Sequence, residues 1–374
     1  MRPYSHEVCV QLDLSADGGA QIVRIVVYCY PSTDYTWSPR SAETGIGGSE
    51  EAVIHMAGAL AMHGHDVAVL NARNGPPQAF GGVTWTSYND PATLDADIGV
   101  VWRRPGLIER VGGIRARRLY LWLHDMVPEA WILPRLEAYF KVMVLSRFHR
   151  NHYPGIPEAR VFRTANGIEP TEFSGSESRD PGLMVYGSCY TRGLRALLNN
   201  WRRIRGAAPG ARLNIFYGWQ TLQRNNPERY ARIRPVLEPL MQQEGVTHLG
   251  CLSHAEVARQ YSTAGVWAYP CSFPETSCIS AMKAQAGGAT PAVIPSGALA
   301  ETVRFGFRTM RSHTDFRGLP FPHRIIDEWL EGLIDLLRSP ERQARIRAEM
   351  IPDSRRRFAW SAIAQAWEQE FASA

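Results

Sequence analysis

The sequence predicts an α/β protein of two domains, in which two doubly wound parallel sheets face each other across a cleft. The chain has 374 residues, which is long enough for two domains of ordinary size. Short apolar runs rich in β-branched residues alternate with helical segments, a pattern typical of parallel sheets covered on both faces. A polar stretch at about 168–182 interrupts the alternation, and we expect it to be the linker between the domains.

The first half of the chain carries the pattern of one domain over residues 22–167. Residues 1–21 lack the apolar core of a signal peptide, so we expect a flexible leader before the first strand. That strand begins at Ile22, and a helix follows from Ser49, its expected N-cap, to a stop at Gly64. Further strands are predicted at 65–72, 83–88, 97–105, 118–127, 141–146 and 160–167, with a short helix at 147–153.

The second half repeats the alternation over residues 183–357. Strands are predicted at 183–188, 211–218, 246–250, 266–272 and 290–295. Helices are predicted between them at 192–206, 227–243, 253–265 and about 278–288. Two strongly helical segments, 324–350 and 360–372, close the chain. Only the order of elements recurs in the two halves, because no sequence repeat links them.

Composition and charge exclude several classes of protein. With 45% hydrophobic and 21% charged residues, the chain is globular rather than disordered or fibrous. The net charge of +5 is too small for a nucleic-acid binder, although it permits an anionic substrate or a peripheral contact with a membrane. The six cysteines are scattered without zinc spacing, which favours reduced thiols and a cytoplasmic location. No window approaches the roughly 20 apolar residues of a spanning helix.

Candidate functional residues follow the strands, because ligands of open parallel sheets bind beyond the carboxyl ends of the strands. In the first half, Gly47 and Gly48 precede a helix whose N-terminus could hold an anion, unless the loop is only a tight turn. His124 ends a strand and could titrate near neutrality or donate to a substrate hydroxyl, or it could be structural. Arg103 and Arg104 end another strand.

The second half offers a basic and an acidic candidate. Arg192 ends a strand and could neutralise a diphosphate, or it could be an exposed residue of the first helical turn. Glu275 lies in the turn "PETS" before a helix that begins near Cys278. Glu275 could bind sugar hydroxyls while the helix N-terminus binds phosphate oxygens. The same helix could also be plain core, packed through Ile279, Met282 and Ala284.

Other patterns carry no function. Asp95 and Asp97 form a DxD pair, but the pair stands at the amino end of a predicted strand and should point away from the cleft. The chain has no HExxH, Walker or GxSxG motif. We therefore expect no metal site and no cofactor beyond a co-substrate.

Taken in order, these motifs resemble the retaining GT-B glycosyltransferases of family 4. The similarity covers about residues 22–374. It rests on "GIGGSEEAVIHMAGALAMHGHDVAVL", "VMVLSRFHRNHY" with "RTANGIEPTEF", "RGLRALLNNWRRIRGAAPGARLNIFYG", "YPCSFPETSCISAMKAQAGGATPAV" and "FAWSAIAQAWEQEF". The resemblance implies two Rossmann-like domains. It also implies a C-terminal helix, at about 358–374, that crosses back to complete the first domain.

The resemblance also implies roles for individual residues. Gly47 and Gly48 would line the cleft near the donor phosphate and the acceptor, and His124 would lie near the transferred sugar. Arg192 would bind the diphosphate. Glu275 would hydrogen-bond the hydroxyls of the donor sugar, supported by the adjacent residues Ser277, Cys278 and Ile279. Trp37, Arg103 and Arg104 are candidates for the acceptor side, although Trp37 could equally pack its own loop.

Two positions depart from the family pattern. Gly187 and Tyr186 stand where the family usually has another basic residue. Lys283 stands where the family has a second acid that accepts hydrogen bonds from the nucleotide's ribose, and an ammonium group has no acceptor. Our hypothesis is that Lys283 neutralises phosphate instead and so partly replaces the missing basic residue.

The resemblance implies a metal-independent transferase that moves a sugar from a nucleotide-diphosphate sugar to an acceptor hydroxyl with retention of configuration. The acceptor would be a saccharide, a lipid-linked sugar or a small molecule. The base and sugar of the donor stay open, as does the oligomeric state. Two alternatives remain from the sequence: a non-catalytic relative that binds a sugar nucleotide, and a sugar-nucleotide epimerase of the same fold.

Overall fold

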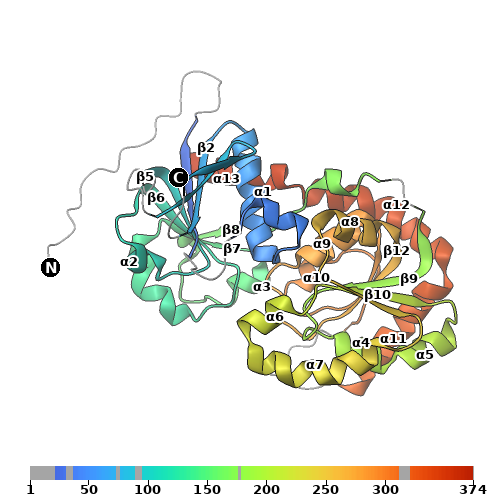
Figure 1. Cartoon of the computed structure of the whole chain (residues 1–374). Helices are drawn as coiled ribbons and strands as arrows, with labels where there is room; N and C mark the ends of the chain where they lie inside the picture. The colour runs from blue at the N-terminus through green and yellow to red at the C-terminus, as the bar shows by residue number, and fades with distance from the viewer. Residues whose placement is uncertain are drawn as a thin grey trace.

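Strand β1 (Arg24–Tyr28) lies in the middle of the first of two parallel sheets in the computed structural model. The model describes residues 22–30, 37–72, 76–88, 95–175, 178–310 and 321–373. The expected leader at 1–21 lies outside the described residues. Figure 1 shows the two sheets side by side, each with its own layer of helices.

The first sheet has eight strands in the order β3-β4-β2-β1-β5-β6-β7-β8 among the described residues. All its pairs are parallel except the edge pair β3–β4. The remaining strands are β2 (Asp66–Ala72), β3 (Gln78–Phe80), β4 (Val83–Ser87), β5 (Asp95–Trp102), β6 (Arg115–Trp122), β7 (Lys141–Val144) and β8 (Val161–Arg163). The helices are α1 (Gly48–Met62), α2 (Leu107–Val111) and α3 (Arg147–Arg150), with 3₁₀ helices at Pro39–Glu43, Glu129–Trp131, Leu133–Ala138 and Glu158–Arg160.

Strand β1 explains why this sheet is covered on both faces. Ile25 and Val27 pack into the core under α1, whereas Val26 and Tyr28 pack into the core on the opposite face. Successive side chains of a strand point to opposite faces, so a continuous apolar run buries both of them. The sequence pattern that predicted a doubly covered strand is therefore satisfied.

The second sheet has six strands in the order β11-β10-β9-β12-β13-β14 among the described residues. Its strands are β9 (Asp180–Gly187), β10 (Arg212–Phe216), β11 (Val246–Gly250), β12 (Ala264–Pro270), β13 (Thr290–Ile294) and β14 (Phe307–Arg308). Its helices are α4 (Leu194–Asn199), α5 (Trp201–Ala207), α6 (Gln220–Asn225), α7 (Pro227–Met241), α8 (His254–Thr263), α9 (Ile279–Gly287), α10 (Leu299–Thr302), α11 (His323–Arg338) and α12 (Pro340–Arg357). A 3₁₀ helix at Pro170–Phe173 precedes β9, which begins inside the segment expected to be a linker.

Three local differences from the predicted elements have physical causes. The helix expected over 324–350 is two helices, because Pro340 disfavours a helical residue before it and starts α12 as its first residue. The helix expected over 192–206 breaks at Asn200, whose amide donates to the carbonyl of Ala196. The N-cap of α1 is Gly47 rather than Ser49.

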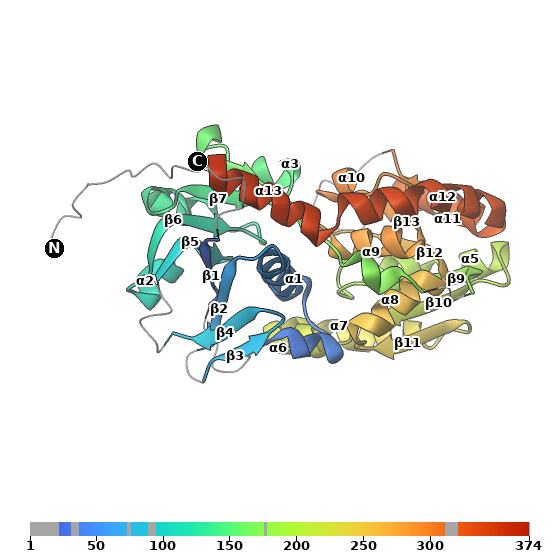
Figure 2. The same cartoon turned by 90° about the horizontal axis from the view of Figure 1, so that it is seen from above.

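The C-terminal helix α13 (Trp360–Ser373) returns to the first domain. Figure 2 shows it beside α1, and the indole of Trp367 packs edge-on against Trp122 at 4.8 Å between ring centroids. The indole N–H of Trp367 donates to Thr164 Oγ1 at 2.6 Å. The prediction of a terminal helix that completes the first domain is confirmed.

The DxD pair and the neighbouring basic run have a structural role. Asp95 stands opposite Arg115 in the β5–β6 register and is paired with it, and Asp97 lies 3.6 Å from Arg117. These residues lie at the amino ends of their strands, away from the cleft, as expected for Asp95 and Asp97.

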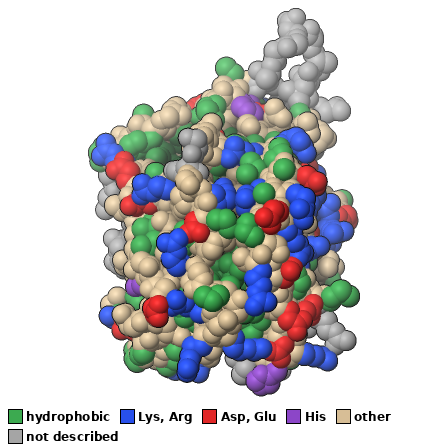
Figure 3. All heavy atoms as spheres, turned by 90° about the vertical axis from the view of Figure 1, so that its right-hand side faces the viewer, with side chains coloured by type: hydrophobic (Ala, Val, Ile, Leu, Met, Phe, Trp, Pro, Cys, Tyr) green, Lys and Arg blue, Asp and Glu red, His purple; other side chains and the backbone are tan. Residues whose placement is uncertain are grey.

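The outer face of the second domain has a mixed character. Figure 3 shows Lys and Arg side chains spread over it among acidic and apolar ones. No helix in the described part of the chain combines the length and the apolar character needed to cross a bilayer.

We predict that truncating Trp367 destabilises the first domain strongly. Trp367 is fully buried, so Trp367→Ala should lower the free energy of unfolding by about 3–5 kcal/mol. The matched control is Trp131→Ala, because Trp131 is 51% exposed and should change stability by less than about 0.5 kcal/mol. Urea unfolding followed by circular dichroism measures both. Equal effects of the two substitutions would show that α13 is not part of the first domain's core.

Candidate functional site

A cavity of about 260 Å³ lies between the two domains, at the carboxyl ends of both sheets. The loop before α1 contributes Gly47 and Gly48 to its wall. The second domain contributes Tyr217, Ser280 and Lys283. The cleft expected from two facing parallel sheets therefore holds predicted residues from both halves of the chain.

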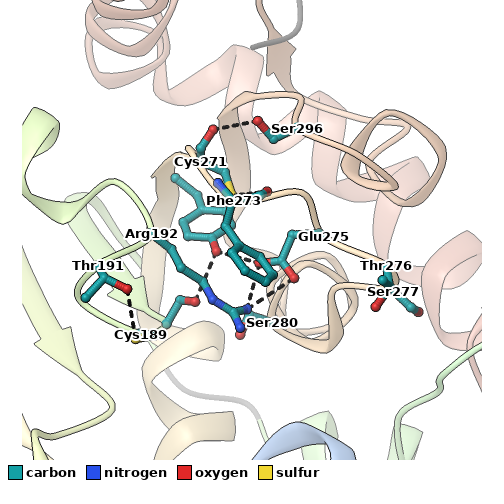
Figure 4. A network of polar contacts seen from close by, with 12 residues as sticks. Cys189, Thr191, Arg192, Cys271, Phe273, Glu275, Thr276, Ser277, Ser280 and Ser296 are labelled. Atoms are coloured by element: carbon teal, nitrogen blue, oxygen red, sulfur yellow. Dashed lines mark hydrogen bonds and ion pairs between the residues drawn. The ribbon is translucent and has the colours of Figure 1, made fainter. Parts of the chain in front are cut away.

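Half-buried Arg192 and buried Glu275 form an ion pair beside the start of α9. Arg192 Nη1 lies 3.0 and 3.2 Å from the two carboxylate oxygens of Glu275, which is 4% exposed. Tyr269 donates its hydroxyl to Glu275 Oε1 at 2.7 Å. Figure 4 shows the guanidinium of Arg192 under the ring of Phe273, with 4.0 Å between Cζ and the ring centroid. Both side chains are therefore fixed in position before any ligand binds.

The backbone around this pair is fixed by a glycine. Gly193 is the N-cap of α4 and has φ of +120°, and a β-carbon there would lie 1.9 Å from the carbonyl oxygen of Pro270. Only glycine tolerates both the conformation and the approach. Gly193 thereby holds the loop carrying Arg192 against the end of β12.

The turn that follows Glu275 is bound by the first domain. Thr276 donates its hydroxyl to the carbonyl of His124 at 2.9 Å, and Ser146 donates to the carbonyl of Thr276 at 2.8 Å. Asn166 donates to the carbonyl of Ser277 at 3.4 Å. Next along the chain, Cys278 is the N-cap of α9, and Ile279 packs against Gly48. The positive N-terminal end of α9 thus lies at the boundary between the domains.

His124 is buried near this boundary. Its ring packs edge-on against Trp122 at 4.4 Å between centroids, and its Nε2 has no hydrogen-bond partner among the described residues. Burial, with contributions from Arg103 and His149, holds the pKa of His124 well below its ordinary value. Of the two functional roles considered for His124, this environment favours a neutral imidazole that hydrogen-bonds a ligand over a side chain that titrates near neutrality.

Lys283 does not offer an unbalanced positive charge. Its ammonium lies 2.6 Å from Glu51 Oε1, and both side chains are 6% exposed. Glu51 belongs to α1 of the first domain, so the pair joins the two domains. The expectation that Lys283 neutralises phosphate is corrected, because Glu51 already balances its charge.

The missing basic residue is not restored where the family pattern would place it. A β-carbon on Gly187 would lie 2.1 Å from the Phe216 ring, so no side chain fits there. Tyr186 is buried and donates to the carbonyl of Cys189. Arg224 lines the cavity from α6. Sequence reasoning missed Arg224 because α6 follows no recognised motif.

The three residues considered for acceptor binding have different environments in the structure. Trp37 is 7% exposed and packs against Trp85 and Trp102, which is the packing role that the sequence left open. Arg103 contacts Asp125 at 2.7 Å. Arg104 is exposed. Of these three, only the two arginines present a polar group near the surface.

Glu51, His55 and His254 offer ligand atoms within 4.8 Å of one another. The ammonium of Lys283 contacts the same carboxylate. A cation bound there would face that positive charge, so the group does not fit a resident metal ion.

Comparison with known proteins identifies the fold. No protein-family model and no curated protein matches the chain. Sucrose-phosphate synthase from Thermosynechococcus elongatus is similar in structure, with a TM-score of 0.69 and 16% identity over 94% of this chain and 100% of that one. Anabaena Alr3699/HepE in complex with UDP-glucose has a TM-score of 0.67 and 14% identity over the same shares of the two chains.

A glycosyltransferase of avilamycin A biosynthesis, AviGT4, matches with a TM-score of 0.57 and 15% identity, over 93% of this chain and 97% of that one. These structures define the class to which the architecture belongs. The chain has the two-domain GT-B fold, and the fold predicted from the sequence is confirmed.

We predict that His149, behind His124, makes stability depend on pH. Its Nδ1 accepts the N–H of Leu145 and its Nε2 contacts the carbonyl of Asp125. Burial lowers the pKa of His149 to about 4, although the hydrogen bond to Asp125 acts in the opposite direction. The unfolded chain therefore binds the proton first, and stability present above about pH 6.5 is lost as the pH falls towards 4.

Urea unfolding at pH 7.5 and pH 5 tests this. His149→Gln should remove about 2 kcal/mol of the stability that the wild type loses between the two pH values. The control is His323→Gln, at an exposed position, which should keep the wild-type pH dependence. An unchanged pH dependence in His149→Gln would contradict the assignment.

Proposed function

We propose that the protein is a retaining glycosyltransferase that transfers a sugar from a nucleotide-diphosphate sugar to an acceptor hydroxyl. The observation that carries the proposal is the Arg192–Glu275 ion pair beside the N-terminus of α9, next to the turn at Thr276 that is hydrogen-bonded to the first domain. The carboxylate of Glu275 can accept hydrogen bonds from sugar hydroxyls. The guanidinium of Arg192 and the backbone N–H groups at the N-terminus of α9 can donate hydrogen bonds to a diphosphate. The GT-B fold and the complexes of similar structures with UDP and UDP-glucose support it.

In this proposal Glu275 accepts hydrogen bonds from hydroxyls of the donor sugar. Arg192 has five N–H donors, and Nη1 alone contacts Glu275. Its side chain is 32% exposed, so the remaining donors can reach an oxygen of the diphosphate. The positive N-terminal end of the α9 dipole would also attract the negatively charged diphosphate. His124 is neutral, and its Nε2 has no hydrogen-bond partner within the described part of the chain, so it would contact the sugar or the acceptor hydroxyl.

The transfer breaks the bond between the sugar's anomeric carbon and the phosphate oxygen and forms a bond from that carbon to the acceptor oxygen. The departing diphosphate takes the acceptor's proton, so no protein nucleophile is needed. The protein's contribution is to align the two substrates and to stabilise the charge that develops on the diphosphate. In this proposal Arg192 and the first turn of α9 stabilise that charge.

Substrates are proposed only as classes. UDP-sugars are the first donors to test, because the similar structures contain UDP and UDP-glucose. The acceptor would bind on the side of the first domain, where Arg103 and Arg104 end β5. A saccharide, a lipid-linked sugar or a small molecule would all present the hydroxyl that the reaction needs.

We predict that Glu275→Ala selectively loses the sugar portion of the donor. Thermal shift with UDP, GDP and ADP and their glucose conjugates should show one sugar nucleotide that stabilises the wild type. In Glu275→Ala that conjugate should bind about tenfold more weakly, because a hydrogen bond to a charged acceptor is lost. Glu244→Ala is the control, since that side chain is 87% exposed. No stabilisation of the wild type by any nucleotide would refute the proposed function.

We predict that Arg192→Lys keeps the fold but loses most of the turnover. A lysine ammonium can balance Glu275, yet it cannot contact the carboxylate and a phosphate in the fixed geometry of a guanidinium. Release of nucleoside diphosphate in the presence of acceptor should fall by about tenfold or more. Release that requires the acceptor identifies a transferase, because an epimerase converts the sugar nucleotide alone and gives no net release of nucleoside diphosphate. Wild-type turnover in Arg192→Lys would remove Arg192 from the catalytic site.

A further inference from the structure

The ion pair between Glu51 and Lys283 joins the two domains at the wall of the cavity. Glu51 lies in the first turns of α1, and Lys283 lies in the second turn of α9. Burying two charges costs free energy that a single ion pair rarely repays, unless further hydrogen bonds satisfy the charged groups. We therefore asked which group satisfies the carboxylate of Glu51.

The protein itself leaves that carboxylate incompletely bonded. The ammonium of Lys283 lies 2.6 Å from Oε1 of Glu51, and no described residue other than Lys283 donates a hydrogen bond to that buried oxygen. Oε2 lies 3.7 Å from Nε2 of His254, which is beyond hydrogen-bond distance. A carboxylate accepts about four hydrogen bonds, so Glu51 has unused capacity.

The carboxylate is nonetheless ionised. Burial raises the pKa of Glu51, but the charge of Lys283 and the two nearby histidines lower it by more, so the net shift is downward. Burial lowers the pKa of His254 to about 4, which leaves that imidazole neutral near pH 7. The wall of the cavity at this point thus carries an ionised acceptor whose charge is balanced by Lys283.

The chemistry of this acceptor selects its ligand. An ionised phosphate has only acceptors and cannot hydrogen-bond the carboxylate of Glu51, whereas a neutral group with two adjacent hydroxyls can donate to it without changing the balance of charge. In a nucleotide-sugar donor, the ribose is such a group. Gly47 and Gly48 line the same cavity.

We propose that Glu51, held in place by Lys283 across the cleft, binds the ribose hydroxyls of the nucleotide donor. This inference rests on the proposed function. The carboxylate for the ribose then comes from α1 of the first domain, while α9 supplies the balancing cation. The ribose site is complete only when both domains contribute, and Lys283 acts as a positioning residue that touches Glu51 rather than the ligand.

The test compares ribonucleotides with 2′-deoxyribonucleotides. Isothermal titration calorimetry measures the Kd of UDP, GDP and ADP and of dUDP, dGDP and dADP for the wild type. The base that binds should show a preference of about tenfold or more for the ribo form. In Glu51→Gln that ratio should fall to about twofold, while the deoxy form binds nearly as it does to the wild type.

Glu51→Gln leaves Lys283 buried without a counter-charge, so a second variant guards against unfolding. Glu51→Gln/Lys283→Met removes both charges at similar side-chain volume, and its ratio should also be about twofold. The matched control is Glu50→Gln, one residue away, where the acid lies 3.7 Å from Arg103 instead of facing Lys283. Its ratio should equal that of the wild type.

Two results would overturn the inference alone: a wild type that binds UDP, GDP or ADP without preferring the ribo form, or variants at position 51 that keep the full preference. In both cases the nucleotide still binds, so the proposed function survives. A wild type that binds no nucleotide overturns the proposed function together with the inference.

Discussion

The parallel direction of the strands is the constraint on which the rest of this structure depends. In each sheet the strands that flank the cleft run the same way, so their carboxyl ends, and the loops that follow, gather at one edge. The two sheets present these edges to each other. Residues as distant in sequence as Glu51 and Lys283 therefore meet, and so do His124 and Thr276.

The contacts across the cleft are of two kinds. Around Thr276 and Ser277 they are hydrogen bonds between neutral groups, made by Ser146, Asn166 and the backbone of His124. One turn into α9 the contact is between full charges. Neutral hydrogen bonds are readily exchanged with water when two surfaces separate, whereas a buried ion pair resists partial separation until both groups are hydrated. The two kinds of contact therefore respond differently to opening of the cleft.

Sequence patterns were sufficient for the fold and for the residues that end strands. The alternation of apolar runs and helices predicts both sheets, and Arg192 and Glu275 follow strands as their positions in the sequence indicate. Pairing across the cleft could not be predicted. An acidic residue such as Glu51 is common in the first turn of a helix, because the positive end of the helix dipole stabilises its charge whichever way the side chain points. Its partner Lys283 is identified only by the placement of two domains.

Trp37 shows a second limit of prediction from the sequence. An aromatic residue in a loop near a predicted cleft suits a saccharide as well as a core, and composition does not separate the two. The difference lies in the tryptophans of β4 and β5, Trp85 and Trp102, whose rings meet Trp37 at 5.5 and 5.6 Å. The breaks in the long helical segments are easier to predict from the sequence, because Pro340 marks one of them directly.

The return of α13 has a mechanical consequence. The chain crosses between the domains twice, and the two crossings lie side by side: Ile168 donates to the carbonyl of Phe358 at 2.8 Å and accepts from Trp360 at 3.1 Å. Because the two crossing segments are hydrogen-bonded to each other, a rotation of one domain relative to the other must move both segments together. Such a pair of segments restricts the relative motion of the domains more than a single linker would.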